Sequence, residues 1–269
     1  MGRIGERFAA LRARGERALV PFVTAGDPDL ATTQTLVLAL ARAGADLIEI
    51  GIPFSDPLAE GPTVQRSSER ALRSGTSLRR VLELVKTLRP QIDVPLVLMG
   101  YTNPILAMGE RRFAEAAHAV GVDGVIVVDL PPDEGEELYG ALAAVGIDAI
   151  LLAAPTTQPA RLAMLAQRTR GFLYYVSLTG VTGARSELAR GVEDAVRSVR
   201  SISEVPVCVG FGVSTPEHAR EIARFADGVV VGSALIDAIQ RAEPGPSAID
   251  AAARFVRELK TALRAAPCA

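Results

Sequence analysis

One junction recurs along the chain and limits the folds that the chain can adopt. A helical segment ends at a glycine, an aspartate follows two residues later, and a short apolar run comes directly after it. Glycine suits the left-handed position that closes a helix. Apolar runs without alternation predict strands that are buried on both faces and paired in parallel. The junctions are Ala43-Gly44-Ala45-Asp46, Val120-Gly121-Val122-Asp123 and Val145-Gly146-Ile147-Asp148, with a variant at Phe225-Ala226-Asp227-Gly228.

Eight apolar runs are predicted to be strands, and segments with apolar residues three and four apart are predicted to be the helices between them. Eight such units in 269 residues predict an α/β fold, a closed (β/α)8 TIM barrel, with residues 1–269 as a single domain. The alternative is an open doubly wound sheet. In a barrel, the functional groups lie at the carboxyl ends of the strands and in the loops that follow. The predicted strands are residues 19–24, 47–50, 96–99, 125–128, 149–152, 172–177, 207–211 and 229–231.

The composition excludes several classes of protein. With 49% hydrophobic and 22% charged residues, the chain can form a large core, so a globular, cytoplasmic protein is expected. The net charge is only -2 and no basic block occurs, so nucleic acid is not an expected partner. No apolar run approaches the length of about 18 residues that a membrane span needs. Cys208 and Cys268 have neither metal-binding nor disulfide spacing.

Glu49 is the strongest candidate for a catalytic group. It interrupts the apolar run 47–50, so its side chain is predicted to face the barrel interior near the carboxyl end of the strand. Burial raises the pKa of a carboxyl group toward neutrality, which suits a general acid and base. The alternative is a structural glutamate paired with an arginine, because buried charges are usually paired.

The loop at residues 53–62 supplies a second candidate carboxylate. Three prolines restrict its backbone, and it carries Asp56 and Glu60. A rigid loop there can direct one carboxylate at a substrate in the barrel mouth. The alternative is an acidic loop that is only solvated surface. This loop and the segment 178–190 after the sixth strand are candidate lids.

Glycines follow three consecutive strands toward the end of the chain. Glycine lets backbone N–H groups approach an anion closely, and Ser233 can cap a helix over residues 234–239 whose positive end favours phosphate. Each glycine alone could be a plain turn, but the series predicts a phosphate site. Its members are Gly180 and Gly183 after the sixth strand, Gly210 and Gly212 after the seventh, and Gly232 with Ser233 after the eighth.

Lysine and histidine are absent from the predicted mouth of the barrel. The two lysines, Lys86 and Lys260, lie in predicted outer helices, which excludes a Schiff-base lysine. The two histidines, His118 and His218, also lie in helical patterns, so a His-ligated metal is not predicted. A site resembling triosephosphate isomerase is disfavoured for the same reason. Carboxylates are therefore expected to perform the acid–base chemistry.

Several motifs resemble the tryptophan synthase alpha subunit family, in the order in which that family has them and over nearly the whole chain. They are VPFVTAGDP (20–28), EIGIPFSDPLA (49–59), GPTVQ (61–65), GYTNPI (100–105), DLP (129–131), GVTG (180–183) and GFGVS (210–214).

The resemblance implies retro-aldol cleavage of indole-3-glycerol phosphate to indole and glyceraldehyde 3-phosphate, a step of tryptophan biosynthesis. Protonation of indole C3 creates the electron sink, so no metal and no cofactor is implied in this chain. Glu49 is the implied proton-transferring group, and the second carboxylate is implied to hold the indole N–H and stabilise positive charge. This chain has Glu60 where the family has aspartate, so its carboxylate lies one methylene further from the backbone. Either the loop compensates, or the activity is weakened or redirected.

The resemblance also implies the residues that bind the substrate, although core packing is an alternative for each apolar one. Phe22, Tyr174 and Phe211, with Met99 and Ile126, correspond to the walls of the family's indole and glycerol pocket; Gly183, Gly212, Gly232 and Ser233 correspond to its phosphate site; and Thr182 corresponds to its lid residue.

A partner is implied as well. The family works as an alpha2-beta2 heterotetramer with a beta subunit that carries pyridoxal phosphate, and the loops after the second and sixth strands lie near that interface. Two alternatives remain open. The chain could be a catalytically impaired barrel that binds the phosphate ligand and activates a beta partner, or a stand-alone lyase that releases indole.

Overall fold

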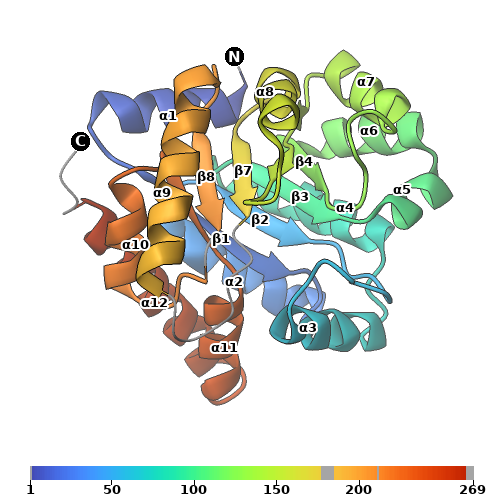
Figure 1. Ribbon diagram of the computed structural model, residues 1–269. Coiled ribbons are helices and arrows are strands. Elements are labelled where there is room, and N and C mark those ends of the chain that lie inside the picture. Colours follow the sequence, from blue (N-terminus) through green and yellow to red (C-terminus); the bar gives the residue numbers. More distant parts are fainter. Residues whose placement is uncertain (1, 177–184, 211, 265–269) are drawn as a thin grey trace.

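The computed structural model describes residues 2–176, 185–210 and 212–264, in which parallel strands alternate with helices (Figure 1). Each predicted strand is present within two residues of its expected bounds, apart from Ser177 and Phe211, which lie outside the described residues. The strands are β1 (Ala18–Thr24), β2 (Ile48–Gly51), β3 (Leu96–Gly100), β4 (Gly124–Val127), β5 (Asp148–Ala149), β6 (Leu152–Ala153), β7 (Leu173–Val176), β8 (Val207–Gly210) and β9 (Gly228–Val231).

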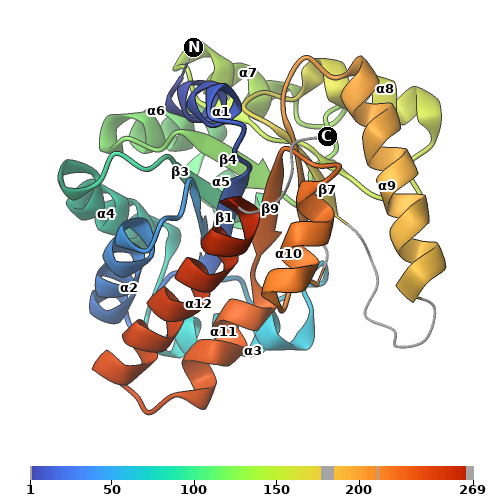
Figure 2. The ribbon, with the colours of Figure 1, turned by 90° about the vertical axis from the view of Figure 1, so that its left-hand side faces the viewer.

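Helices surround the strands, and the last long helix lies beside the two helices that precede it (Figure 2). A turn at residues 244–245 precedes this last helix, Pro246–Arg264. The helices are α1 (Arg3–Ala13), α2 (Leu30–Arg42), α3 (Pro62–Arg73), α4 (Leu78–Leu88), η1 (Arg89–Gln91), α5 (Thr102–Met108), α6 (Glu110–Val120), α7 (Glu136–Ala144), α8 (Pro159–Arg168), α9 (Arg185–Ile202), α10 (Pro216–Ala223), α11 (Ser233–Arg241) and α12 (Pro246–Arg264).

The sheet closes on itself. Its order, β5-β4-β3-β2-β1-β9-β8-β7-β6, follows the chain, and β5 and β6 are two parts of one segment, residues 148–153. This segment pairs with β4 at its start and with β7 at its end. Between them, Ile150 N donates to Val125 O at 2.9 Å, and Tyr174 N donates to Leu151 O at 3.0 Å. The two edges of the sheet are thus one strand, which gives a curled, TIM-barrel-like sheet. The doubly wound alternative is wrong, because the strand order of such a sheet reverses.

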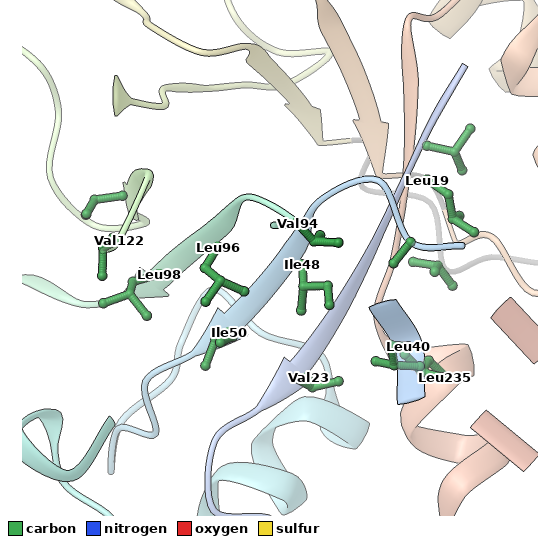
Figure 3. Close-up of a cluster of buried hydrophobic side chains, with 14 of the residues drawn as sticks. Leu19, Val23, Leu40, Ile48, Ile50, Val94, Leu96, Leu98, Val122 and Leu235 are labelled. Carbon is green, nitrogen blue, oxygen red and sulfur yellow. The ribbon is translucent and has the colours of Figure 1, made fainter. Parts of the chain in front are cut away.

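The strands are buried on both faces, and alternation decides which side chain faces which layer. In β2, Ile48 and Ile50 belong to the layer between the sheet and the helices, together with Leu40 of α2 (Figure 3). Leu47 belongs to a separate cluster inside the barrel. Because successive side chains of a strand point to opposite faces, Glu49 shares the interior face with Leu47.

Helix α1 closes the amino-terminal end of the barrel. Its buried residues Ile4, Phe8 and Leu11 pack into the interior cluster. The ring centroid of Phe8 lies 6.0 Å from that of Phe172, which comes just before β7. Apolar side chains therefore fill the barrel from the end opposite the carboxyl ends of the strands.

The recurring junction holds neighbouring strands together. Its glycines have positive φ, as predicted, with values of 103° at Gly44, 87° at Gly121 and 78° at Gly146. Three junction aspartates accept a hydrogen bond from a backbone N–H near the start of the preceding strand. The pairs are Asp46 with Leu19 N at 2.8 Å, Asp123 with Leu96 N at 2.9 Å and Asp227 with Val207 N at 3.0 Å.

Candidate active site

Glu49 lies where its sequence pattern predicts, in β2 and facing the barrel interior. Its side chain is buried, with 1% exposed, and neither carboxylate oxygen has a hydrogen-bond partner among the described residues. The alternative, a structural glutamate paired with an arginine, is therefore wrong within the residues that the structure describes. Burial raises the pKa of Glu49 to about 8, and the charge of Glu60 adds to the effect.

Glu60 comes from the loop between β2 and α3 and is half-buried. Burial raises the pKa of its carboxyl group to about 7. The alternative that the acids of this loop are only solvated surface is wrong for Glu60. It holds for Asp56, which is exposed and accepts a hydrogen bond from its neighbour Ser55.

The loop rests on Tyr101. Ala59 N donates to Tyr101 Oη at 3.1 Å, and the ring of Phe54 stacks on the Tyr101 ring with centroids 4.9 Å apart. These contacts attach the loop that carries Glu60 to Tyr101, the residue that follows β3.

Glu49 and Glu60 line one cavity of about 310 Å³ at the carboxyl ends of the strands. Its lining combines apolar side chains with the two carboxyl groups, and two of the lining residues, Phe22 and Val64, form a small buried cluster with Ile236. A cavity with apolar walls and a few directed polar groups is the usual form of a small-molecule site. Its lining comprises Phe22, Glu49, Glu60, Val64, Met99, Tyr174, Gly210, Gly212, Val213, Ser214, Val230, Gly232, Ser233, Ala234 and Asp237.

Tyr174 forms one wall of the cavity and remains protonated. Burial, followed by the charges of Glu49 and Glu60, raises the pKa of its hydroxyl well above the ordinary value. A Cβ atom on Gly210 would lie 2.5 Å from Tyr174 Oη, so a glycine is needed there for the ring to keep its place.

The predicted phosphate residues Gly212, Gly232 and Ser233 line the same cavity as the two acids. Gly212 has a φ of 47°, in the left-handed region that glycine adopts readily. The prediction that Ser233 caps a helix over 234–239 is wrong, because α11 begins at Ser233 itself and Gly232 is the N-cap residue. The start of α11 still lies at the cavity edge, where Gly232, Ser233 and Ala234 line the cavity and the positive end of the helix suits an anion.

Three predicted site residues, Thr182, Gly183 and Phe211, lie outside the described residues, as do Gly180 and most of the predicted second lid. The end of that lid is wrong, because α9 begins at Arg185 and the loop does not extend to residue 190. Met99 lines the cavity, whereas Ile126 is fully buried in the interior cluster.

The lysines and histidines lie in helices, as predicted: Lys86 in α4, His118 in α6, His218 in α10 and Lys260 in α12. Among the described residues, no group of three or more His, Cys, Asp or Glu side chains is arranged to hold a metal ion. No described helix combines the length and the apolar character needed to cross a membrane.

Val64 and Asp237 are among the cavity residues that the sequence analysis missed, and both lie on helices. Asp237 follows Ser233 by four positions within α11, which is the spacing that places side chains on one helical face, and Val64 lies in the first turn of α3. That spacing is a usable signal once a loop and a helix start have been identified. Asp237 Oδ1 also accepts a hydrogen bond from Thr63 Oγ1 at 3.2 Å, which joins α11 to α3.

A larger hollow, of about 660 Å³, lies between α6 and α7. None of the predicted site residues lines it. The smaller cavity at the barrel mouth is therefore the candidate active site, since chemistry rather than size distinguishes it.

Fold and cavity together define a class: a TIM-barrel-like α/β enzyme with two carboxyl groups at the carboxyl ends of its strands. A sequence model of the tryptophan synthase alpha chain family matches residues 8–264, and the chain belongs to this family. It is an indole-3-glycerol-phosphate lyase of tryptophan biosynthesis.

Individual relatives agree with this assignment. The tryptophan synthase alpha chain of Citrifermentans bemidjiense is 57% identical over 260 residues, which are 97% of each chain. The crystal structure of tryptophan synthase subunit alpha from Legionella pneumophila has a TM-score of 0.91 at 39% identity, covering 98% of both chains. Tryptophan synthase from M. tuberculosis in its aminoacrylate-bound form has a TM-score of 0.88 at 35% identity, covering 98% of this chain and 100% of that chain.

Proposed function

We propose that Glu49 transfers the protons of the cleavage reaction. The observation that carries this is a buried carboxyl group without a hydrogen-bond partner among the described residues, facing a cavity large enough for a small molecule. With its pKa raised to about 8, the group is mostly protonated at neutral pH and can give a proton as well as take one.

The proposed reaction balances within the substrate. A proton added to indole C3 makes the ring electron-poor, and removal of the proton from the glycerol hydroxyl forms the new carbonyl. The carbon–carbon bond breaks, and its electrons return to the ring. The products are indole and glyceraldehyde 3-phosphate, without any external oxidant or reductant. Glu49 is proposed for both proton transfers.

Glu60 is proposed to bind the indole N–H and stabilise the positive charge that develops on the ring. Its carboxyl group lines the same cavity as Glu49 but comes from a different element, so the two acids can contact different parts of one substrate. An N–H donor would favour the ionised form of Glu60 and bring its raised pKa back down.

Phosphate binding is proposed at the part of the cavity wall that the predicted glycine series forms. Gly212 lines it after β8, Gly232 and Ser233 line it at the start of α11, and Gly183 is proposed with them. Phe22, Tyr174 and Phe211 are proposed as apolar walls for the indole and glycerol parts. Thr182 is proposed as the lid residue that closes toward Glu60.

A beta subunit is the proposed partner, in an alpha2-beta2 heterotetramer, with pyridoxal phosphate in the partner and no cofactor in this chain. The aminoacrylate-bound form of the M. tuberculosis enzyme supports this proposal. So does the surface near the mouth, where Leu58 is 91% exposed in the Glu60 loop and Leu106 is 53% exposed in α5. A partner that covers this surface would remove these two apolar side chains from water.

Residues 1–269 are proposed to act as one domain, since one closed sheet contains every strand described. A cytoplasmic location is also proposed, because the charges of a phosphate ester prevent it from crossing an apolar bilayer. The enzyme must then work where its substrate is made.

The test is indole release from indole-3-glycerol phosphate by purified protein. We expect Glu49→Gln to lower kcat by about a hundredfold or more while substrate binding persists. Unchanged turnover would overturn the role of Glu49.

Adding a beta subunit separates the alternatives. Full turnover without it supports a stand-alone lyase. No turnover in either case, with activation of the beta subunit by the phosphate ligand, supports a catalytically impaired activator. Cleavage that the beta subunit accelerates supports the heterotetramer.

A further inference from the structure

Gln65, on the first turn of α3, reaches back to the loop that carries Glu60. Its amide Nε2 donates to Glu60 O at 2.9 Å and lies 3.5 Å from Pro57 O, a longer and weaker contact. One side chain thus contacts both ends of the tetrapeptide 57–60.

We infer that Gln65 is a positioning residue for Glu60. By holding the Glu60 peptide against α3, it determines how far the Glu60 carboxylate reaches into the cavity. This inference rests on the proposed role of Glu60. Gln65 is the residue that links the position of Glu60 to α3.

The need for such a contact follows from where α3 starts. The first backbone bond of this helix runs from Gln65 N to Gly61 O at 3.0 Å, and Gly61, the N-cap residue, supplies no side-chain cap. The carbonyl of Glu60 therefore lies one residue outside the helical ladder. The side-chain amide of Gln65 supplies the donor that the ladder does not.

Helix α3 is a fixed support because it is bound to the last residue of β1 and to the loop that follows. The Ser67 hydroxyl donates to Thr24 Oγ1 in a buried contact. Arg70 donates two hydrogen bonds to the Asp27 carboxylate, each 2.7 Å long. A planar, two-point pair of this kind fixes orientation as well as distance.

The loop has a second point of attachment on the other side. Ala59 N donates to Tyr101 Oη at 3.1 Å, so the residue before Glu60 is tied to the end of β3 while Glu60 itself is tied to α3. Two attachments on adjacent residues restrict rotation of the peptide between them. Loss of the Gln65 contact leaves the Tyr101 contact and the turn bond from Glu60 N to Pro57 O at 3.0 Å.

The test replaces Gln65 with methionine, which keeps the length of the side chain but has no N–H donor. We expect kcat for indole release to fall by about 10- to 100-fold, because small misplacements of a catalytic group have effects of that size. KM is expected to change little, since the proposed phosphate residues lie after β8 and β9.

Gln91→Met is the matched control. Gln91 Nε2 also donates to a backbone carbonyl, Thr87 O at 2.8 Å, but on the exposed surface after α4. Its replacement is expected to leave kcat and KM unchanged.

A double-mutant cycle with Glu60→Gln shows whether Gln65 acts through Glu60. If it does, Gln65→Met lowers kcat much less in the Glu60→Gln background than in the native chain. If the fold-changes in kcat of the two single substitutions simply multiply in the double variant, the inference is wrong. A folded Gln65→Met variant with native kcat also overturns it. A Glu60→Gln variant with native kcat overturns the proposed role of Glu60 instead, which keeps the two failures distinguishable.

Gln65→Asn serves as a second variant if the methionine variant does not fold. It keeps a polar amide but is one methylene shorter, so it cannot reach the Glu60 carbonyl from the same backbone position. The same loss of kcat is expected, and native kcat in this variant overturns the inference.

Discussion

Glu60 lines the same cavity as Glu49, and its charge adds to burial in raising the pKa of Glu49. Burial also raises the pKa of Glu60, to about 7. Near neutral pH the pair retains a proton. The substrate therefore meets a proton donor and a potential carboxylate in one cavity.

The raised pKa of Glu49 predicts a pH-dependent cost to stability. Its carboxyl group has a pKa of about 8 in the folded chain and an ordinary value of 4.5 when unfolded. Between these values the folded state binds the extra proton, so the stabilisation present at low pH is lost as pH rises through 8. Compared with Glu49→Gln, the native chain should lose a few kcal/mol of unfolding free energy between about pH 5 and pH 8. Urea unfolding of both proteins at the two pH values measures the difference in their unfolding free energies. A difference that does not change with pH would contradict the raised pKa of Glu49.

Glu60→Asp tests whether the loop is built for the longer side chain. The backbone around Glu60 is tied to Tyr101 and Gln65, so a shorter side chain withdraws the carboxylate from the cavity. We expect kcat to fall by about tenfold. A large gain in cleavage would instead mean that the native glutamate impairs the enzyme.

Gly51→Ala should disturb the cavity wall. The added Cβ would lie 2.5 Å from Cζ of Phe22, whose ring lines the cavity. Overpacking of this kind costs about 1–3 kcal/mol of stability, and the displaced ring should raise KM. Gly140→Ala in α7 is the control, because nothing lies within 4 Å of its added Cβ. It should leave KM unchanged and change stability by no more than about 1 kcal/mol, in the stabilising direction. Equal effects of the two variants on KM would contradict the packing argument.

Lys260→Met should destabilise the chain at the end of β2 opposite the active site. Lys260 Nζ lies 2.7 Å from Asp46 Oδ2, and both side chains are buried. Removing one partner of a buried ion pair costs about 3–5 kcal/mol, because the other charge is left without compensation. Lys86→Met, at the exposed lysine of α4, should change stability by no more than about 0.5 kcal/mol. The urea unfolding midpoints of the two variants measure this difference in stability, and similar midpoints would refute the prediction.

The sequence determined those features that depend on neighbouring residues. The uninterrupted apolar runs indicated strands buried on both faces, and the glycines at 44, 121 and 146 marked helix ends that require positive φ. An acid within the apolar run 47–50 predicted that Glu49 faces the barrel interior. The family motifs then suggested the chemistry.

Only the tertiary structure decided what depends on segments far apart in the chain. The burial of Glu60, the place of Asp237 at the cavity edge and the contact of Gln65 with the Glu60 loop all require α3 and α11 to be packed against the barrel. The pair of Asp46 and Lys260 joins residues 214 positions apart. Burial and pairing depend on which surfaces meet when the barrel closes. No local pattern of residues records that information.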